Sequence, residues 1–417
     1  MPAPSAEHRL AHVLRHLDAV CHIPLNARPG YDGLAPVRLP PVTTAADTFF
    51  RGHAPLPPAE DEIQWLHLYG SRMPVLFEGD IISTIFFWIS GWQEFHSLER
   101  DKLGRFPYSA SLQARLGCIG LPVADMLLEV LRLWLEDTSG LALLRHPPLP
   151  VLSVSHDVDR LRGGWRATAR HYWHAGQPFT ALKCILHHFT GRDDPFDNLI
   201  LLAKIVREET SLASTFFFLG AQDTHSFGPN ADYDLSSAKL QRRIHELESL
   251  GCSIGLHGSF GSSDDSDQLR IELNKLPHIT AGVRFHFLRF DPIKTPDVLM
   301  RAGATYDATL GFAERAGFRH GTAHPFWLYD FHRQRTHRIV CQPLHVMDVT
   351  FANPSYQFTP APDIPYRIAD LAKAAQICGG SLSILWHNQY IVFGEEVLGE
   401  DTLRKTLRLV MQGKYNI

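Results

Sequence analysis

The chain has 417 residues, which is longer than one domain usually is. Its hydrophobic content of 45% is enough for at least one large core. Its 40 Lys and Arg residues oppose 44 Asp and Glu residues, for a formal net charge of −4, so no overall basic field attracts nucleic acid and we expect no nucleic-acid partner. No stretch reaches the roughly 18 apolar residues of a membrane-spanning helix, and residues 1–25 lack the apolar centre of a secretory signal, so we expect a cytoplasmic protein without a membrane span.

The first 150 residues predict a small α+β domain. Residues 27–60 are rich in proline, short apolar runs of mixed character follow, and residues 123–140 carry apolar side chains at helical spacing with Gly140 as the stop. The proline cluster HPPLP at 146–150 cannot be helical and marks a domain boundary. We therefore expect an N-terminal domain of unknown role over 1–150 and a catalytic domain over 151–417. The six cysteines lie far apart without a CxxC pair, which predicts free thiols.

After residue 150, short apolar runs alternate with segments of helical periodicity. We expect helices over 197–209, after Ser236 or Ser237, from Thr295 and Pro296 onward, and over 367–378. We expect seven strands, over 151–155, 214–220, 253–258, 282–287, 304–311, 344–351 and 382–388. Strands that are apolar on both faces and alternate with helices are typical of a parallel sheet. A barrel gathers the carboxyl ends of such strands at one mouth, so the predicted fold is α/β, an incomplete seven-stranded (β/α) barrel preceded by the smaller α+β domain.

The segment VLSVSHDVD, residues 151–159, ends in two carboxylates. Asp157 and Asp159 share one side of an extended strand, so both can point into one pocket while Val158 packs behind them. Two close carboxylates resist joint ionisation unless a cation lies between them. One carboxylate would bind a metal and the other would act as a base. The structural alternative is a helix cap or an ion pair with Arg160 or Arg162.

Later strands also end in ionisable side chains. In SIGLHG, His257 follows an apolar run and is flanked by Gly255 and Gly258, where a ligand can approach the backbone, and His387 ends the apolar run LSILWH. A single buried histidine is more often a hydrogen-bonded core residue, but the shared position at strand ends favours a functional role for both. Asp307 and Asp348 also stand late in strand segments, where turn and capping roles compete with a functional one.

Arg284 and His286 alternate with apolar residues in GVRFHF, so their side chains share one face of the strand. A buried Arg284 requires a carboxylate partner, which we expect to be Asp157, with Asp291 as the alternative. No GxSxG elbow or P-loop occurs, so a nucleophilic serine has no support. Three aromatic residues are candidates for a wall on which a sugar stacks, and core packing explains them equally well: Trp327, Trp386 and Tyr390.

Four of these segments follow the order of four motifs of the polysaccharide deacetylase family. SHDVD resembles the family's first motif, T-F-D-D; GLHGSFG its second, H-S/T-x-x-x-H; RFHF its third, R-x-P-Y; and ILWH its last, a leucine-rich strand that ends in histidine. Residues 151–388 therefore resemble the NodB-type carbohydrate esterases of family four. The whole chain, with DIISTIFFWISGWQEF and GRFPYSASL upstream, resembles a bacterial subgroup found with surface-polysaccharide genes.

The resemblance implies roles for five polar residues: Asp157 as the catalytic base, Asp159 as the metal-binding carboxylate, His257 as the first metal histidine, Arg284 as the arginine that orients the base, and His387 as the general acid. This chain departs from the family pattern in three ways. DVD replaces adjacent aspartates, so the two carboxylate roles can be exchanged; Gly261 stands where a second metal histidine is expected; and His286 replaces the proline of the third motif. A zinc-like ion needs about three protein ligands, so we expect His286 to supply the missing one, with His156 as the substitute.

These residues together favour a metal-dependent hydrolase. We expect the enzyme to bind a divalent metal ion, namely zinc. The expected reaction removes an N-acyl group, namely acetyl, from an amino sugar. That sugar would be part of a nucleotide-linked precursor, a lipid-linked precursor or a glycan. One alternative is a metal-free hydrolase of cyclic amides with the same fold. Another is a catalytically inactive barrel that binds sugars or serves assembly in polysaccharide synthesis.

Overall fold

The N-terminal part of the chain is built mainly from helices packed around α3 (Ile81–Ile89). The computed structural model describes residues 2–57, 63–174, 176–189, 194–225, 228–276, 282–391 and 398–413. Asp80 caps α3 by accepting the Ser83 N–H at 2.9 Å. The expected helix over 123–140 is α6 (Val123–Ser139), closed by Gly140 in the left-handed conformation. Further elements are α1 (Ala6–Val20), α2 (Thr44–Gly52), α4 (Trp92–His96), α5 (Leu112–Leu116), the parallel pair β1 (Pro29–Gly30) and β2 (Val37–Arg38), and the antiparallel pair β3 (Gln64–Leu68) and β4 (Ser71–Val75).

A nine-stranded sheet forms the centre of the rest of the chain. Its order is β12 (Phe326–Asp330), β13 (Arg335–Cys341), β11 (Tyr306–Asp307), β10 (Val283–Phe285), β9 (Ser253–Gly258), β6 (Thr215–Leu219), β5 (Leu152–Val158), β15 (Leu382–Leu385) and β14 (Val346–Met347). Neighbouring strands are parallel except β12 with β13. All seven expected strands lie in this sheet, so the α/β class is right. The expected count of seven is wrong, because the hairpin β12–β13 is added at one edge.

Two segments of the sheet differ from what the sequence pattern predicts. The hairpin β12–β13 has no single apolar face, because Phe326 and Leu328 pack in the sheet core whereas Tyr329 and Phe331 pack in the N-terminal core. The strand expected over 344–351 is shorter: β14 ends at Met347, and Asp348 begins helix α13 (Asp348–Ala352). A carboxylate is favourable in the first turn of a helix, so Asp348, which the sequence pattern placed inside the strand, starts the helix instead.

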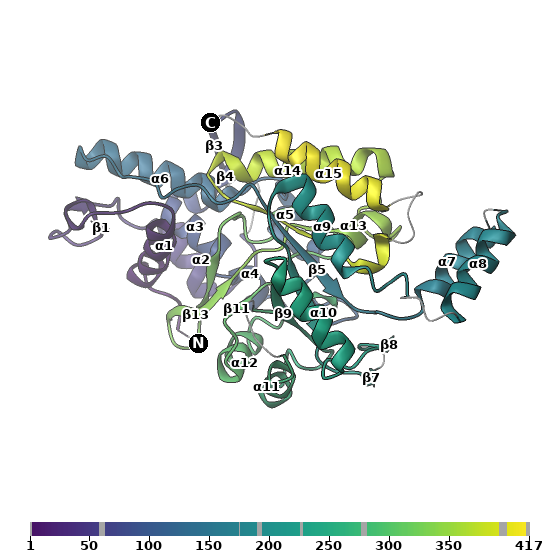
Figure 1. The fold of residues 1–417 in the computed structure, drawn as a ribbon. Coiled ribbons are helices and arrows are strands. Elements are labelled where there is room, and N and C mark those ends of the chain that lie inside the picture. The colour runs from purple at the N-terminus through teal and green to yellow at the C-terminus, as the bar shows by residue number, and fades with distance from the viewer. Residues whose placement is uncertain are drawn as a thin grey trace.

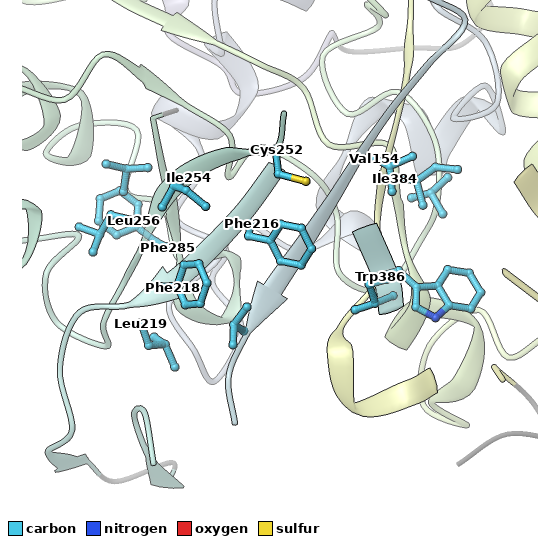
Figure 2. Close-up of a cluster of buried hydrophobic side chains, with 14 of the residues drawn as sticks. Val154, Phe216, Phe218, Leu219, Cys252, Ile254, Leu256, Phe285, Ile384 and Trp386 are labelled. Atoms are coloured by element: carbon cyan, nitrogen blue, oxygen red, sulfur yellow. The ribbon is translucent and has the colours of Figure 1, made fainter. Parts of the chain in front are cut away.

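Helices cover the outer face of the sheet. The four expected helices are present as α9 (Leu199–Thr210), α10 (Ala238–Ser249), α12 (Thr295–Ala302) and α14 (Ile364–Ile377). Two further helices are α11 (Ser266–Leu273) and α15 (Glu400–Gln412). Phe216 and Phe218 of β6 pack in the apolar core between sheet and helices (Figure 2). Phe217 lies on the other face of the strand, where the Arg284 guanidinium stands 4.5 Å from its ring centroid. The two faces of the strand thus separate an apolar core from a polar interior.

A helical hairpin projects from the molecule on the side opposite the N-terminal helices (Figure 1). It consists of α7 (Gly164–His174) and α8 (Pro178–Phe189). A short antiparallel pair, β7 (Thr224–His225) and β8 (Gly228–Pro229), lies in the loop after β6.

All six cysteines are free thiols, as expected. Within the described ranges, no helix combines the length and the apolar character needed to cross a bilayer.

Buried polar contacts join the two parts of the chain. Glu94 of α4 accepts hydrogen bonds at 2.7 and 2.6 Å from Arg319, and Asp125 of α6 accepts one at 2.7 Å from the N–H of Ala323. The N-terminal core also takes in Tyr329 and Phe331. Because Arg319, Ala323, Tyr329 and Phe331 contact the first part, the division of the chain at residue 150 stays a prediction.

Candidate active site

The carboxyl ends of neighbouring strands gather the polar residues named from the sequence. Asp157 is the second-to-last residue of β5, and Asp159 directly follows the strand. His257 Nε2 lies 3.7 Å from Asp157 Oδ2 and 3.4 Å from Asp159 Oδ1. The two carboxylates therefore face the same side. The structure brings six residues to this edge of the sheet: Asp157 and Asp159 from β5, His257 from β9, Arg284 from β10, His286 from the turn η4 (His286–Leu288) that follows, and His387 from the end of β15.

Arg284 is the partner of Asp157, as expected. Its guanidinium donates hydrogen bonds to Asp157 Oδ1, to Ser155 Oγ and to the carbonyl of Ala308, each at 2.9 Å. Both charged side chains are only 2% exposed, and buried charges need such pairing. The alternative partner, Asp291, instead accepts the N–H of Ile293. The ion pair orients Asp157 and leaves its Oδ2 toward His257.

Asp159, His257 and His286 form a group suited to a metal ion. Their ligand atoms all lie within 4.8 Å of one another, and the Nε2 atoms of His257 and His286 are 3.4 and 3.8 Å from Asp159 Oδ1. The second nitrogen of His257 lies 2.8 Å from the carbonyl of Arg284, and that of His286 lies 3.4 Å from Asn230 Oδ1. Such contacts orient histidine ligands and fix which nitrogen faces the metal.

The donor set passes a direct test of fit. Asp159 Oδ1 is buried and has no hydrogen-bond partner, and an uncompensated buried carboxylate oxygen is costly. One carboxylate and two imidazole nitrogens are the ligand types and the number that a catalytic zinc site uses. Asp159 is 19% exposed, which leaves one side of the group open to solvent.

His387 stands beside this group and is held by Asp348. Its Nδ1 lies 2.7 Å from Asp348 Oδ1, its backbone N–H donates to Asp348 Oδ2 at 2.6 Å, and its Nε2 lies 3.8 Å from Asp159 Oδ2. The Nδ1–H therefore points at a carboxylate, and Nε2 faces the other site residues. Tyr390 neighbours His387 with ring centroids 6.1 Å apart.

The pKa values of the three site histidines shift in different directions. Burial lowers the pKa of His257, but Asp157 and Asp159 outweigh burial and raise it. Burial lowers the pKa of His387, but the carboxylates of Asp348, Asp159 and Asp157, with Asp348 the largest contributor, more than offset this and raise it to about 10. Burial lowers the pKa of His286 to about 4, because the nearby Asp159 compensates only in part. Burial raises the pKa of Asp159, yet the neighbouring histidines hold it well below its usual range. At neutral pH the His387 ring is therefore protonated on both nitrogens, whereas His286 is neutral and its Nε2 keeps a free lone pair.

Several sequence-based expectations need correction. His156, the substitute ligand, lies on the opposite face of β5 from Asp157: its Nδ1 is 2.8 Å from the carbonyl of Trp386 and its ring packs on Phe216 in the core. Period-two alternation along the strand causes this. Trp386 is itself fully buried in the core (Figure 2). Trp327 packs against His16, so neither tryptophan forms a wall at the site.

The glycines beside His257 serve packing rather than ligand approach. A Cβ on Gly255 would meet the Phe217 ring at 2.7 Å, and one on Gly258 would meet the Phe285 ring at 2.6 Å. Residues with a side chain are therefore excluded by the neighbouring aromatic rings, and the strand stays close to its partners on both sides.

Two residues of the site were given no definite role by the sequence pattern. Asp348 holds His387, and the only signal was its position late in a strand segment; the pairing of Met347 with Leu385 brings it beside His387. Asn230 contacts His286 from a loop, and no motif marks it. Both depend on pairing between distant segments.

The turn that carries His286 is held by the N-terminal part. Phe287 and Leu288 adopt positive φ values of 60° and 55°, a conformation unfavourable for residues other than glycine. Arg105 donates to the carbonyl of Phe287 at 2.9 Å, and Arg289 donates to the carbonyl of Leu103 at 3.1 Å. The segment around residue 105 therefore stabilises a strained turn next to a candidate ligand.

Comparisons with known proteins give limited similarity. Residues 43–139 match the model of a family of unknown function, DUF7033, a range that contains none of the site residues. No curated protein matches the chain significantly. A crystal structure from Mycobacterium smegmatis, provisionally assigned as a polysaccharide deacetylase, is similar over 64% of this chain and 88% of its own, with 16% sequence identity and a TM-score of 0.39.

Proposed function

We propose that this chain is a metal-dependent hydrolase that removes an N-acyl group, acetyl, from an amino sugar in a nucleotide-linked or lipid-linked precursor for surface-polysaccharide synthesis. The observation that carries the proposal is the partnerless buried oxygen of Asp159 with the Nε2 atoms of His257 and His286 aimed at it. The pairs formed by Asp157 with Arg284 and by His387 with Asp348 surround this group.

Asp159, His257 and His286 would hold the metal. Zinc bound there would supply a Lewis acid that polarises the acyl carbonyl and lowers the pKa of water. The second nitrogens of both histidines are turned to Arg284 O and Asn230 Oδ1, which keeps their Nε2 atoms directed to Asp159.

The chain's own residues would move the protons. Asp157, oriented by Arg284, accepts a proton from the water that attacks the acyl carbon. The carbon–nitrogen bond then breaks, and His387, protonated through its contact with Asp348, donates a proton to the departing amine. The products are a free amino sugar and a carboxylic acid.

Metal content and acyl release measured on the same preparations test the proposal. Wild-type protein should bind about one zinc ion, lose turnover of acetylated amino-sugar nucleotides on chelation, and regain it with zinc. Asp159→Asn and His257→Gln should lose the metal. Asp157→Asn should keep it and lose turnover on the order of a hundred- to ten-thousand-fold. His245→Gln, on an exposed helix face, is the control.

Two results would contradict the proposal in different ways. Turnover that survives complete chelation would favour the metal-free cyclic-amide hydrolase. Metal binding through His257 without acyl release from any substrate of the panel would favour a sugar-binding or assembly module.

A further inference from the structure

The hairpin of α7 and α8 begins at Gly164, five residues after Asp159, and so rises from the same edge of the sheet as the candidate site. The two helices pack against each other, and they project away from the sheet and the helices that cover it (Figure 1). A projecting hairpin buries little of its own surface against the rest of the protein. Its outer face is therefore free to meet another molecule.

An exposed apolar stripe runs along α8. Four residues spaced three, four and three apart fall on one side of the helix, and they are between 52% and 88% exposed: Phe179, Leu182, Leu186 and Phe189. Ala181, on the opposite side, is buried. On the neighbouring helix α7, Trp173 is 66% exposed. Contiguous exposed apolar surface of this kind marks an interaction site.

The charged residues of the same segment are all basic, although the chain as a whole is acidic. Residues 160–189 contain no Asp or Glu and five basic residues besides histidine: Arg160, Arg162, Arg166, Arg170 and Lys183. None of these five forms a salt bridge within the part of the chain that the structure describes. The formal net charge of the whole chain is −4, so this positive region stands apart from the rest.

A basic cleft lies at the base of the hairpin. It has a volume of about 730 Å³ and is lined by Arg160, Arg162 and Arg166 together with Trp165. Two carboxylates also line it, but both are engaged. Asp194 accepts the N–H groups of Gly163, Gly164 and Phe196, and Asp197 is paired with Lys239 and Arg243. The cleft therefore presents cationic groups suited to phosphate.

We propose that the α7–α8 hairpin and the basic cleft at its base dock on the surface of an anionic lipid bilayer. An amphipathic helix with aromatic and leucine side chains on one face and Lys or Arg beside it lies in the membrane interface. The apolar stripe enters the acyl boundary, and the arginines contact lipid phosphates. Nucleic acid explains the basic residues but not the apolar stripe, so the bilayer accounts for both features.

Docking in this way defines the class of substrate. Because the hairpin rises from the carboxyl ends of the strands, it brings Asp159 and its neighbours close to the bilayer surface. Resting on the proposed function, this geometry points to an acylated amino sugar attached to a lipid phosphate, with the lipid remaining in the membrane. The sugar would reach the site from the bilayer rather than from solution.

Vesicle binding of the full chain tests the proposal. Wild-type protein should sediment with vesicles of phosphatidylcholine containing about one third phosphatidylglycerol, but not with pure phosphatidylcholine. Binding should weaken strongly at roughly 0.5 M NaCl, because salt screens the lipid charge. The double variant Phe179→Ser with Phe189→Ser should lose binding. Arg166→Gln with Arg170→Gln should weaken it by about fivefold for each cation removed.

Matched substitutions elsewhere provide the controls. Leu34→Ser with Leu98→Ser removes two apolar side chains that are 95% and 97% exposed, and Arg335→Gln with Arg338→Gln removes two exposed cations; neither pair should change vesicle binding. Equal binding to neutral and anionic vesicles would overturn the proposal. So would retention of binding by the apolar variant, a wild-type dimer that this variant dissociates, or displacement from vesicles by double-stranded DNA.

Further outcomes separate this proposal from the enzymatic one. Asp157→Asn should bind vesicles as wild type does, since it leaves the hairpin unchanged. Vesicle binding without any acyl hydrolysis would contradict the proposed function alone. Hydrolysis of soluble acetylated amino sugars without vesicle binding would contradict the docking alone. If both hold, the apolar variant should lose activity on lipid-linked substrate in vesicles and keep it on soluble substrate.

Discussion

Asp348 contributes most to the raised pKa of His387, ahead of Asp159 and Asp157. Asp348 contacts both Nδ1 and the backbone N–H of His387. Asp348→Asn removes the charge that raises the pKa of the imidazole, so less of it is protonated at neutral pH and its orientation is less secure. We expect kcat to fall on the order of a hundredfold with little change in KM and no change in metal content. An unaltered kcat would show that His387 is not the proton donor.

Two buried histidines are fixed in the neutral form by the backbone. His345 Nδ1 accepts the N–H of Ser383 at 3.0 Å while Nε2 donates to the carbonyl of Thr322 at 3.1 Å. His16 Nε2 accepts the N–H of Trp327 at 3.0 Å while Nδ1 donates to the carbonyl of His12 at 2.8 Å. A second proton on either ring would face an N–H group. Burial accordingly lowers the pKa of both histidines to about 4.

Stability should therefore fall in mild acid. Between pH 6.5 and 4, the unfolded chain binds a proton at each of these histidines and the folded chain does not, so protons favour unfolding. Each histidine contributes on the order of 3 kcal/mol across this window. The free energy of unfolding from urea titrations should decrease from pH 6.5 to pH 4.

A variant isolates this effect. His345→Gln keeps a donor and an acceptor but takes up no proton, so its free energy of unfolding should depend less steeply on pH. The exposed His245→Gln should follow the wild-type slope. Identical slopes for all three proteins would place the acid sensitivity elsewhere.

Among the elements, the turn η4 combines strain with a candidate ligand. Two consecutive left-handed residues cost roughly 1–2 kcal/mol each, and the hydrogen bond from Arg105 to the carbonyl of Phe287 helps to hold them. Arg105 is itself paired with Asp101 at 2.7 Å. The segment around Arg105 thus supports the turn that carries the candidate ligand His286.

Arg105→Ala should weaken metal binding. Because the turn loses its outside support, we expect zinc affinity to drop by about 10- to 100-fold, measured by competition with a chromogenic chelator. Arg100→Ala is the matched control, since Arg100 bonds carbonyls of residues 94, 97 and 99 within the N-terminal part. Equal affinities for both variants and the wild type would exclude a positioning role for Arg105.

In the whole molecule, a buried ion pair ties the N-terminal helices to the segment between β11 and β12. Glu94 and Arg319 are each 2% exposed, and Arg319 also donates to the carbonyl of Gly311 at 2.8 Å. His320 Nε2 lies 3.5 Å from Glu94. Neutralising one partner leaves the other charge buried, which is strongly destabilising.

Glu94→Gln should lower the free energy of unfolding by about 3–5 kcal/mol. Because the pair links both parts, wild-type protein should unfold in one calorimetric transition and the variant should separate into two. Asp267→Asn, which breaks an exposed pair with Arg270, should cost at most about 1 kcal/mol. A variant that unfolds in one transition at the wild-type temperature would contradict this coupling.

Local pattern was enough to identify the strands that build the site. Apolar runs that end in Asp157, His257 and His387 could be read from the sequence, because strand alternation and strand ends depend on neighbouring residues only. The same local signals marked α6 and its end at Gly140. The side shared by Asp157 and Asp159 followed directly from the period of two.

Tertiary structure alone decided what lies across from each of these residues. The sequence left His286 and His156 both open as ligands, and the opposite face of β5 removes His156. The contact of Asp348 with His387 and the division of β12–β13 between two cores depend on which strands become neighbours. Strand pairing joins segments far apart in the chain, and no single segment carries the information that selects its partner, so these features emerge only when the whole sheet is assembled.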